Sequence, residues 1–166
     1  MGVADYLDRF RLLLPWVLAA AGAVAVTALI TVWVAQPDRV DEPLASAALF
    51  ATVVAVGVFV ALRPLEKLVL AQPQPAADTL ELAWDDAFRA TTLSTLRLSA
   101  ALAAWVALAV AVGALWLGSG GLFSTFATQL PTWGVIALQF VYPNTGRRLR
   151  TPLYPEWLRR PVGSPA

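Results

Sequence analysis

The sequence predicts an all-α polytopic membrane protein in which four transmembrane helices form two hairpins. Four stretches of the 166 residues contain no charged side chain, and each has about the 20 residues that an α-helix needs to cross a hydrocarbon core. Hydrophobic residues make up 58% of the chain, as expected where lipid-facing and protein-facing positions are both apolar. The predicted spans, within one membrane domain over residues 1–166, are 12–35, 43–62, 98–117 and 121–142.

The first span is predicted to be a retained helix rather than a cleaved signal peptide. Its apolar run is longer than the roughly 7–15 residues of a signal-peptide core. Trp33 also stands near its end, where a cleavage site needs small residues. A short loop that contains Asp38, Asp41 and Glu42 follows, and the second span then completes the first hairpin.

Between the second and third spans, two further helical parts are predicted. Residues 63–70 continue the second helix, and the stretch Gln-Pro-Gln-Pro at 72–75 ends it, because Pro removes a donor and restricts the residue before it. Asp78 is a good N-cap, and from Thr79 a helical pattern runs without Gly or Pro into the third span. A helix of about 39 residues would be about 58 Å long, so its first part must project from the membrane or bend into the interface.

The basic residues predict the orientation. Of the 12 Lys and Arg residues, all but Arg39 lie before the first span, between the second and third spans, or after the fourth. Because cytoplasmic loops carry the excess of positive charge, both termini, the helical segment 63–97 and the basic tail 143–166 are predicted to be cytoplasmic. The composition is typical of a GC-rich bacterial genome, so we expect a multi-pass protein of the bacterial plasma membrane.

Two hairpins of the same topology lead to the hypothesis of a parallel 2+2 repeat. The tripeptide Phe-Ala-Thr at 50–52 recurs at 126–128, 76 positions later. Chance matching within a sequence rich in Ala, Val and Leu is the alternative explanation.

Small residues also recur at every fourth position of three spans, which favours close helix packing in a compact or self-associating bundle. In the first span they are Ala19, Ala23, Thr27 and Thr31; in the second, Ala47, Ala51 and Ala55; and in the third, Ser99, Ala103, Ala107 and Ala111.

The segment before the third span is the best candidate for a partner-docking surface. Trp84 and Phe88 share one helical face, and Asp85 and Arg89 form an i,i+4 pair on another. One interpretation is a docking helix that receives a cytoplasmic partner, in the way that ABC permeases present coupling helices to their ATPases. The other is an amphipathic lead-in whose aromatic rings lie at headgroup level.

The fourth span is the likeliest intramembrane site because polar residues gather in it. Pro131 interrupts this span and frees a backbone carbonyl, and Gln129 needs several partners, so it should face protein or water rather than lipid. The functional interpretation is a polar lining for a substrate path, and the structural one is hydrogen bonding between helices. The polar face consists of Thr125, Thr128, Gln129 and Thr132.

The C-terminal tail interleaves basic and aromatic residues. Arg147, Arg148 and Arg150 are predicted to contact anionic lipid headgroups, since each basic residue near the membrane surface contributes about 1 kcal/mol. The basic field is too small for nucleic-acid binding, so no nucleic-acid partner is expected.

The composition argues against catalysis and bound cofactors. The chain has no Cys and no His, so thiol chemistry and the usual zinc, copper and haem ligands are missing. Glu81 and Asp85 are one turn apart, as in intramembrane phosphotransferases that hold a metal, but a solvated helix face is the better interpretation because no second acidic cluster accompanies them. We therefore predict no enzyme activity, no metal and no cofactor.

Arg97, at the edge of the third span, is expected to extend to the membrane surface.

The segment 84–90, Trp-Asp-Asp-Ala-Phe-Arg-Ala before an Ala- and Leu-rich span, resembles uncharacterised actinobacterial four-helix integral membrane proteins of the kind encoded beside ABC-transporter ATPases. This resemblance implies a transport-associated role and brings no catalytic residues. The leading prediction is a non-catalytic membrane subunit of an ABC-type export system that binds a cytoplasmic ATPase, or another membrane subunit, through residues 79–92. The alternatives are a small homo-oligomeric pore or carrier, and a structural membrane scaffold.

Overall fold

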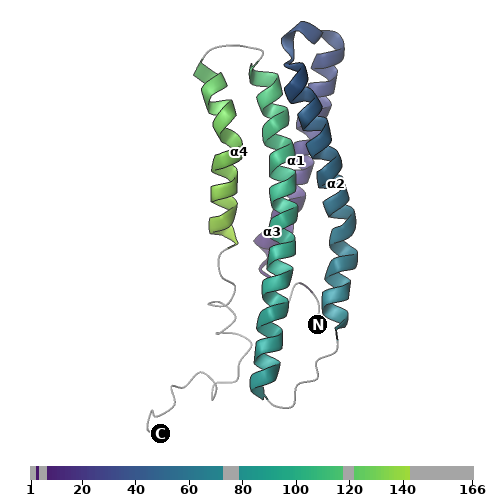
Figure 1. Ribbon diagram of the computed structural model, residues 1–166, viewed down its shortest axis with the longest axis vertical. Coiled ribbons are helices and arrows are strands. Elements are labelled where there is room, and N and C mark those ends of the chain that lie inside the picture. Colours follow the sequence, from purple (N-terminus) through teal and green to yellow (C-terminus); the bar gives the residue numbers. More distant parts are fainter. Residues whose placement is uncertain (1–2, 4–6, 73–78, 118–121, 143–166) are drawn as a thin grey trace.

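The protein is a bundle of long helices, as the sequence predicts (Figure 1). The computed structural model describes residues 3, 7–72, 79–117 and 122–142, without the side chains of 79–83, 117 and 122–127. The described residues contain no strand. Their elements are α1 (Arg9–Ala35), a short 3₁₀ turn η2 (Pro37–Arg39), α2 (Glu42–Ala71), α3 (Thr79–Leu117) and α4 (Leu122–Val141).

Capping residues set the start of the first two helices. The Asp8 carboxylate accepts a hydrogen bond of 2.9 Å from the Arg11 amide and so caps α1. The Asp41 carboxylate accepts one of 3.0 Å from the Leu44 amide and caps α2. Between them, the Gln36 amide donates to the Val32 carbonyl, and Pro37 opens the turn that reverses the chain.

The predicted extensions of the second and third helices are confirmed. Helix α2 continues through Pro64 to Ala71, well past residue 62, and α3 is one continuous helix of 39 residues. Figure 1 shows α2 and α3 running together beyond the end of the bundle at which α1 begins and α4 ends. We call this the basic end, because the exposed Arg9, Arg63 and Lys67 lie there.

Three helices, α1, α2 and α3, are long and apolar enough to cross a membrane. This confirms the membrane-helix character of the chain, while a fourth crossing by α4 stays a prediction.

The 2+2 repeat also stays a prediction. The two hairpins pack differently, since α3 and α4 contact each other extensively whereas α1 and α2 contact each other little.

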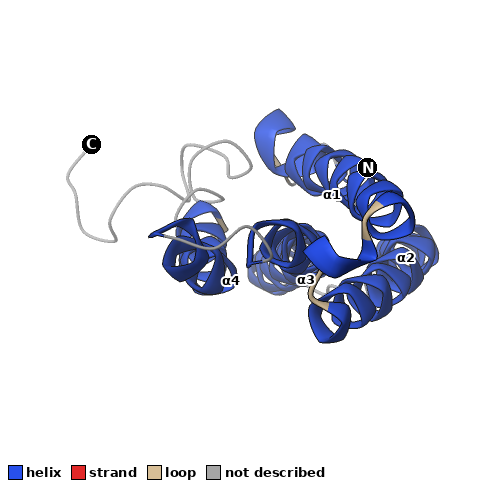
Figure 2. Ribbon diagram, turned by 90° about the horizontal axis from the view of Figure 1, so that it is seen from above, coloured by secondary structure: helices blue, strands red, loops and turns tan. Residues whose placement is uncertain are grey.

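Helix α3 is the centre of the bundle, with α4 on one side and α1 and α2 on the other (Figure 2). Its alanines explain this position, because small side chains let neighbouring backbones approach closely in lipid. The alanines of α3 that are 0% exposed are Ala90, Ala100, Ala101, Ala111 and Ala114.

The small-residue stripes differ in their surroundings. Ala107 and Ala111 of α3 are buried against other helices, whereas Thr27 and Thr31 of α1 are exposed. The two threonine hydroxyls donate to carbonyls one turn earlier in their own helix, both at 2.8 Å. These polar groups are therefore satisfied without a second helix.

One indole joins α4 to α3. The Trp105 Nε1–H points at two carbonyls of α4, 3.2 Å from that of Leu130 and 3.3 Å from that of Pro131. Gly134 makes this approach fit, because a Cβ at this position would overlap the indole ring. The Pro-interrupted helix thus packs against α3 through an aromatic donor.

Adding a methyl group at Gly134 should loosen this contact. In Gly134→Ala the new Cβ would overlap the Trp105 ring, and overpacking of this kind typically costs about 1–3 kcal/mol. Gly57→Ala is the matched control, since a Cβ at Gly57 meets nothing within 4 Å. Unfolding in mixed detergent micelles measures both free energies. Equal stability of the two variants would contradict the close approach at Gly134.

Candidate functional site

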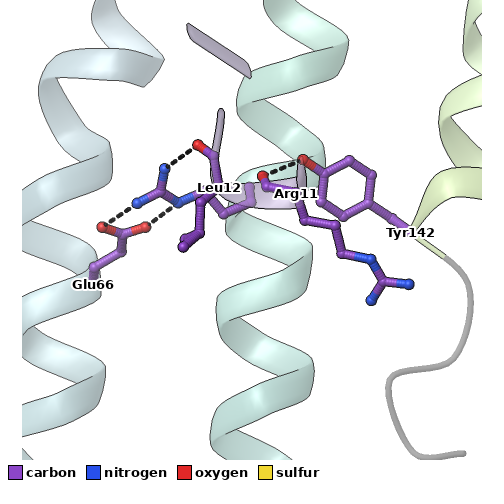
Figure 3. Close-up of polar contacts among 5 residues, drawn as sticks. Arg11, Leu12, Glu66 and Tyr142 are labelled. Atoms are coloured by element: carbon purple, nitrogen blue, oxygen red, sulfur yellow. Dashed lines mark hydrogen bonds and ion pairs between the residues drawn. The ribbon is translucent and has the colours of Figure 1, made fainter. Parts of the chain in front are cut away.

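A buried ion pair joins three helices near the basic end of the bundle (Figure 3). Glu66 of α2 is 5% exposed and Arg97 of α3 is 8% exposed. The Arg97 Nε–H and Nη2–H groups donate to the two Glu66 carboxylate oxygens, the second at 3.0 Å. The remaining Arg97 nitrogen, Nη1, donates at 3.2 Å to the carbonyl of Leu12 in α1.

A second polar contact brings in the end of α4. The Tyr142 hydroxyl, just past α4, donates at 2.9 Å to the carbonyl of Arg11 (Figure 3). In a regular helix this carbonyl would accept from the amide four residues later, but that residue is Pro15, which has no N–H. The buried Pro15 therefore creates the acceptor that Tyr142 uses.

The cluster is electrostatically self-contained. Both Glu66 oxygens accept from one guanidinium, which is the bidentate geometry that Arg and carboxylate groups favour. Asp8 lies beside the other buried arginine, with its Oδ2 3.5 Å from Arg11 Nε. Among the described residues, no buried side-chain nitrogen or oxygen lacks a hydrogen-bond partner. These contacts fix the helices against one another.

This cluster was not predicted from the sequence. The expectation that Arg97 extends to the membrane surface is wrong, because Arg97 is buried against Glu66. The two residues are 31 positions apart, so helical spacing could not pair them. The available signals were the opposite charges of Glu66 and Arg97, one on each side of the Pro-rich turn, and the position of Pro15 four residues after Arg11.

The predicted docking residues lie on the part of α3 beyond this cluster. Trp84 and Phe88 are 61% and 66% exposed, and their ring centroids are 6.3 Å apart. Asp85 and Arg89 are partly buried, and an Arg89 nitrogen donates to the Gln72 carbonyl at the end of α2. Asp85, Phe88 and Arg89 also line a small cavity of about 180 Å³ between the two helices.

The predicted polar face of α4 points away from the other helices of the chain. Thr128, Gln129 and Thr132 are exposed, while the side chain of Thr125 lies outside the described residues. Within one copy of the chain Gln129 is exposed, and the expectation that it faces protein or water rather than lipid stays a prediction. Arg147, Arg148 and Arg150 also lie outside the described residues.

In the described part of the chain, no three His, Cys, Asp or Glu side chains are close enough to hold a metal ion. No protein-family model, curated protein or solved structure matches the chain.

Removing Glu66 should destabilise the bundle far more than removing an exposed charge beside it. Glu66→Gln leaves the Arg97 guanidinium buried without a counter-ion, which typically costs about 3–5 kcal/mol. Lys67→Gln, at the next and exposed position, should change stability by less than about 0.5 kcal/mol. Detergent unfolding of the purified protein measures both.

The double variant Glu66→Leu with Arg97→Met separates the charge from the packing. It removes both ions and should recover most of the lost stability, since apolar residues of similar volume replace buried ion pairs at little cost. A Glu66→Gln variant as stable as Lys67→Gln would show that the ion pair does not hold the helices together.

Proposed function

We propose that the chain is a non-catalytic membrane subunit of a bacterial ABC-type export system and that it binds a cytoplasmic ATPase. In this proposal all four helices cross the plasma membrane, and both termini are cytoplasmic. The docking site is the tip of the α2–α3 projection, within residues 79–92.

The charge distribution supports this orientation. Among the described residues, the basic end carries Arg9, Arg63, Lys67 and Arg89, while Arg39 lies at the opposite end. That opposite end also carries the acidic residues of the α1–α2 loop and of the start of α2. Because Lys and Arg are enriched on the cytoplasmic side, the basic end is assigned to the cytoplasm.

The observation that carries the proposal is the projection of an exposed aromatic pair on a braced pair of helices. The Glu66–Arg97 pair joins α2 to α3, and Leu7 packs against Ala90 and Leu93 above the aromatic pair. Trp84 and Phe88 lie beyond these contacts and are exposed. Trp is among the residues enriched in the energetic hot spots of protein–protein interfaces, and Phe is enriched in interface cores.

Removing both rings should abolish partner binding. In Trp84→Ala/Phe88→Ala the two large exposed contacts are lost, and hot-spot residues of this kind typically contribute about 2 kcal/mol or more each. Trp133→Ala/Phe140→Ala is the matched control, because it removes the same two residue types from exposed positions on α4. The measurement is co-purification of an ATPase after gentle extraction from the native cell, with cross-linking from position 85.

An ATPase that is retained by the wild type and by the α4 control, but lost from the α3 variant, is the expected result. An ATPase cross-linked at position 85 would also place the basic end in the cytoplasm. Equal retention by both double variants would place the docking site elsewhere, and the absence of any ATPase would contradict the proposal.

A second candidate function, a homo-oligomeric pore or carrier, is favoured by the exposed Gln129. In an apolar helix that crosses a membrane, an amide side chain on the outer surface needs hydrogen-bond partners. Helix α4 packs mainly against α3, so a second copy of the chain could supply those partners. A structural scaffold, by contrast, would need neither this face nor the aromatic pair.

Gln129→Leu distinguishes these candidates. It should reduce self-association and solute flux in reconstituted vesicles if α4 forms a polar path, since each interhelical hydrogen bond contributes about 0.6–2 kcal/mol. ATPase binding should stay unchanged. Gln139→Leu is the control, because Gln139 is an exposed amide of the same helix outside the predicted polar face. Identical behaviour of the two variants in oligomer mass and flux would contradict the pore interpretation.

A further inference from the structure

We infer that the groove between α1 and α2 binds one acyl chain of an anionic phospholipid, with the lipid phosphate beside Arg9 and Arg63. The inference rests on insertion of α1, α2 and α3 into a membrane and does not depend on which partner binds the projection.

The groove is a surface cavity of about 410 Å³, within the range of about 300–1,000 Å³ found for ligand pockets. Its rim includes Trp16 of α1 and Val56 and Val60 of α2, all exposed. The groove therefore opens outward between these two helices. Its floor is formed by the buried residues Gly22, Ala55, Ala104 and Ala107.

The groove follows from how α1 and α2 pack. Near their connecting loop they share a core that includes Leu29 and Ala45. Toward the basic end each of them packs against α3 instead, so the small residues of α3 become the floor between them. Trp16 and Phe59 then meet edge to face, with ring centroids 5.0 Å apart, at the basic end of the groove.

The residues that line the groove are mainly apolar and therefore favour binding of a hydrocarbon chain. Among the described residues that line the groove, only Thr52 and the Trp16 indole carry a polar group, and the Thr52 hydroxyl donates at 2.7 Å to the Ala48 carbonyl of its own helix. The rest of the lining is apolar. From Thr52 to Val60 the groove extends about 12 Å along α2 at 1.5 Å per residue. One leaflet of a hydrocarbon core is about 15 Å deep, half of roughly 30 Å.

Positive charge lies where the headgroup of that chain would be. Val56, Val60, Arg63 and Lys67 follow one another at spacings of three or four residues, so the rim of α2 leads directly to two exposed cations. Arg9 lies two turns before Trp16, on the same side of α1 by helical spacing.

The carboxylates at the basic end of the two helices that flank the groove have basic partners. Arg97 neutralises Glu66, and the Asp8 carboxylate lies 3.5 Å from Arg11 Nε. The other described carboxylates at this end, Asp85 and Asp86, lie on α3. The acidic residues Asp38 and Asp41 lie at the opposite end of the bundle. An anionic headgroup is therefore attracted to the basic end, and its acyl chain would extend from there into the groove.

The test is a lipid titration of the full chain in detergent micelles, read by native mass spectrometry. Phosphatidylglycerol and phosphatidylcholine with identical acyl chains are compared. We expect one tightly retained phosphatidylglycerol per chain and weaker retention of phosphatidylcholine. Arg9→Gln and Arg63→Gln should each weaken phosphatidylglycerol retention about fivefold, as expected for one basic residue near an anionic surface. Arg39→Gln, at the other end, should have no effect.

A second pair of variants tests the groove itself. Ala23 lines the groove at an exposed position, so Ala23→Leu should fill part of it and reduce retention of both lipids. Ala21→Leu adds the same side chain at an exposed position of α1 outside the groove and should leave retention unchanged. Equal effects of Ala23→Leu and Ala21→Leu, or equal retention of the two lipids by the wild type, would overturn the inference. Occupation of the groove by a helix of a second copy would also overturn it.

Discussion

The ion pair between Glu66 and Arg97 is the contact on which the arrangement of the helices depends. Two charges at this depth are costly to desolvate, and they are tolerated only where geometry and additional hydrogen bonds compensate. Here one guanidinium contacts α2 through both oxygens of a carboxylate and α1 through a main-chain carbonyl. Sliding or rotating any of these helices would leave a buried charge without its partner. Apolar packing alone specifies helix register weakly in lipid, where lipid tails and side chains are equally apolar. The ion pair supplies the register.

Two of the prolines, Pro15 and Pro131, lie at polar contacts between elements of the bundle. Pro15 removes one donor from α1, and the Arg11 carbonyl left without it accepts the Tyr142 hydroxyl. Near Pro131 of α4, the Trp105 indole donates to the carbonyls of Leu130 and Pro131. In an apolar environment an unpaired carbonyl is costly, so the donor that Pro15 removes from α1 is replaced by the Tyr142 hydroxyl from the end of α4. The residue that weakens α1 thus provides the acceptor for a contact with the end of α4.

The sequence predicted the helices well and their neighbours poorly. The charge-free stretches, the predicted continuation of the second helix and the lack of Gly and Pro after Thr79 were enough to place α1, α2 and the full length of α3. Helical spacing identified faces but could not say what covers them. It singled out Thr27 and Thr31 for packing, and both are exposed. The burial of Arg97 was missed for the same reason, because its partner comes from another helix.

The central position of α3 accounts for both candidate functional surfaces. Because α1 and α2 each pack mainly against α3 and contact each other little, an apolar groove is left between them. Because α2 and α3 stay together beyond α1 and α4, an exposed aromatic pair is carried away from the bundle. Arg97 lies between these two surfaces and contacts both helices that flank the groove, through the Leu12 carbonyl on α1 and Glu66 on α2. Any change in the separation of α1 and α2 must therefore stretch a contact of Arg97, the residue that also fixes the base of the projection.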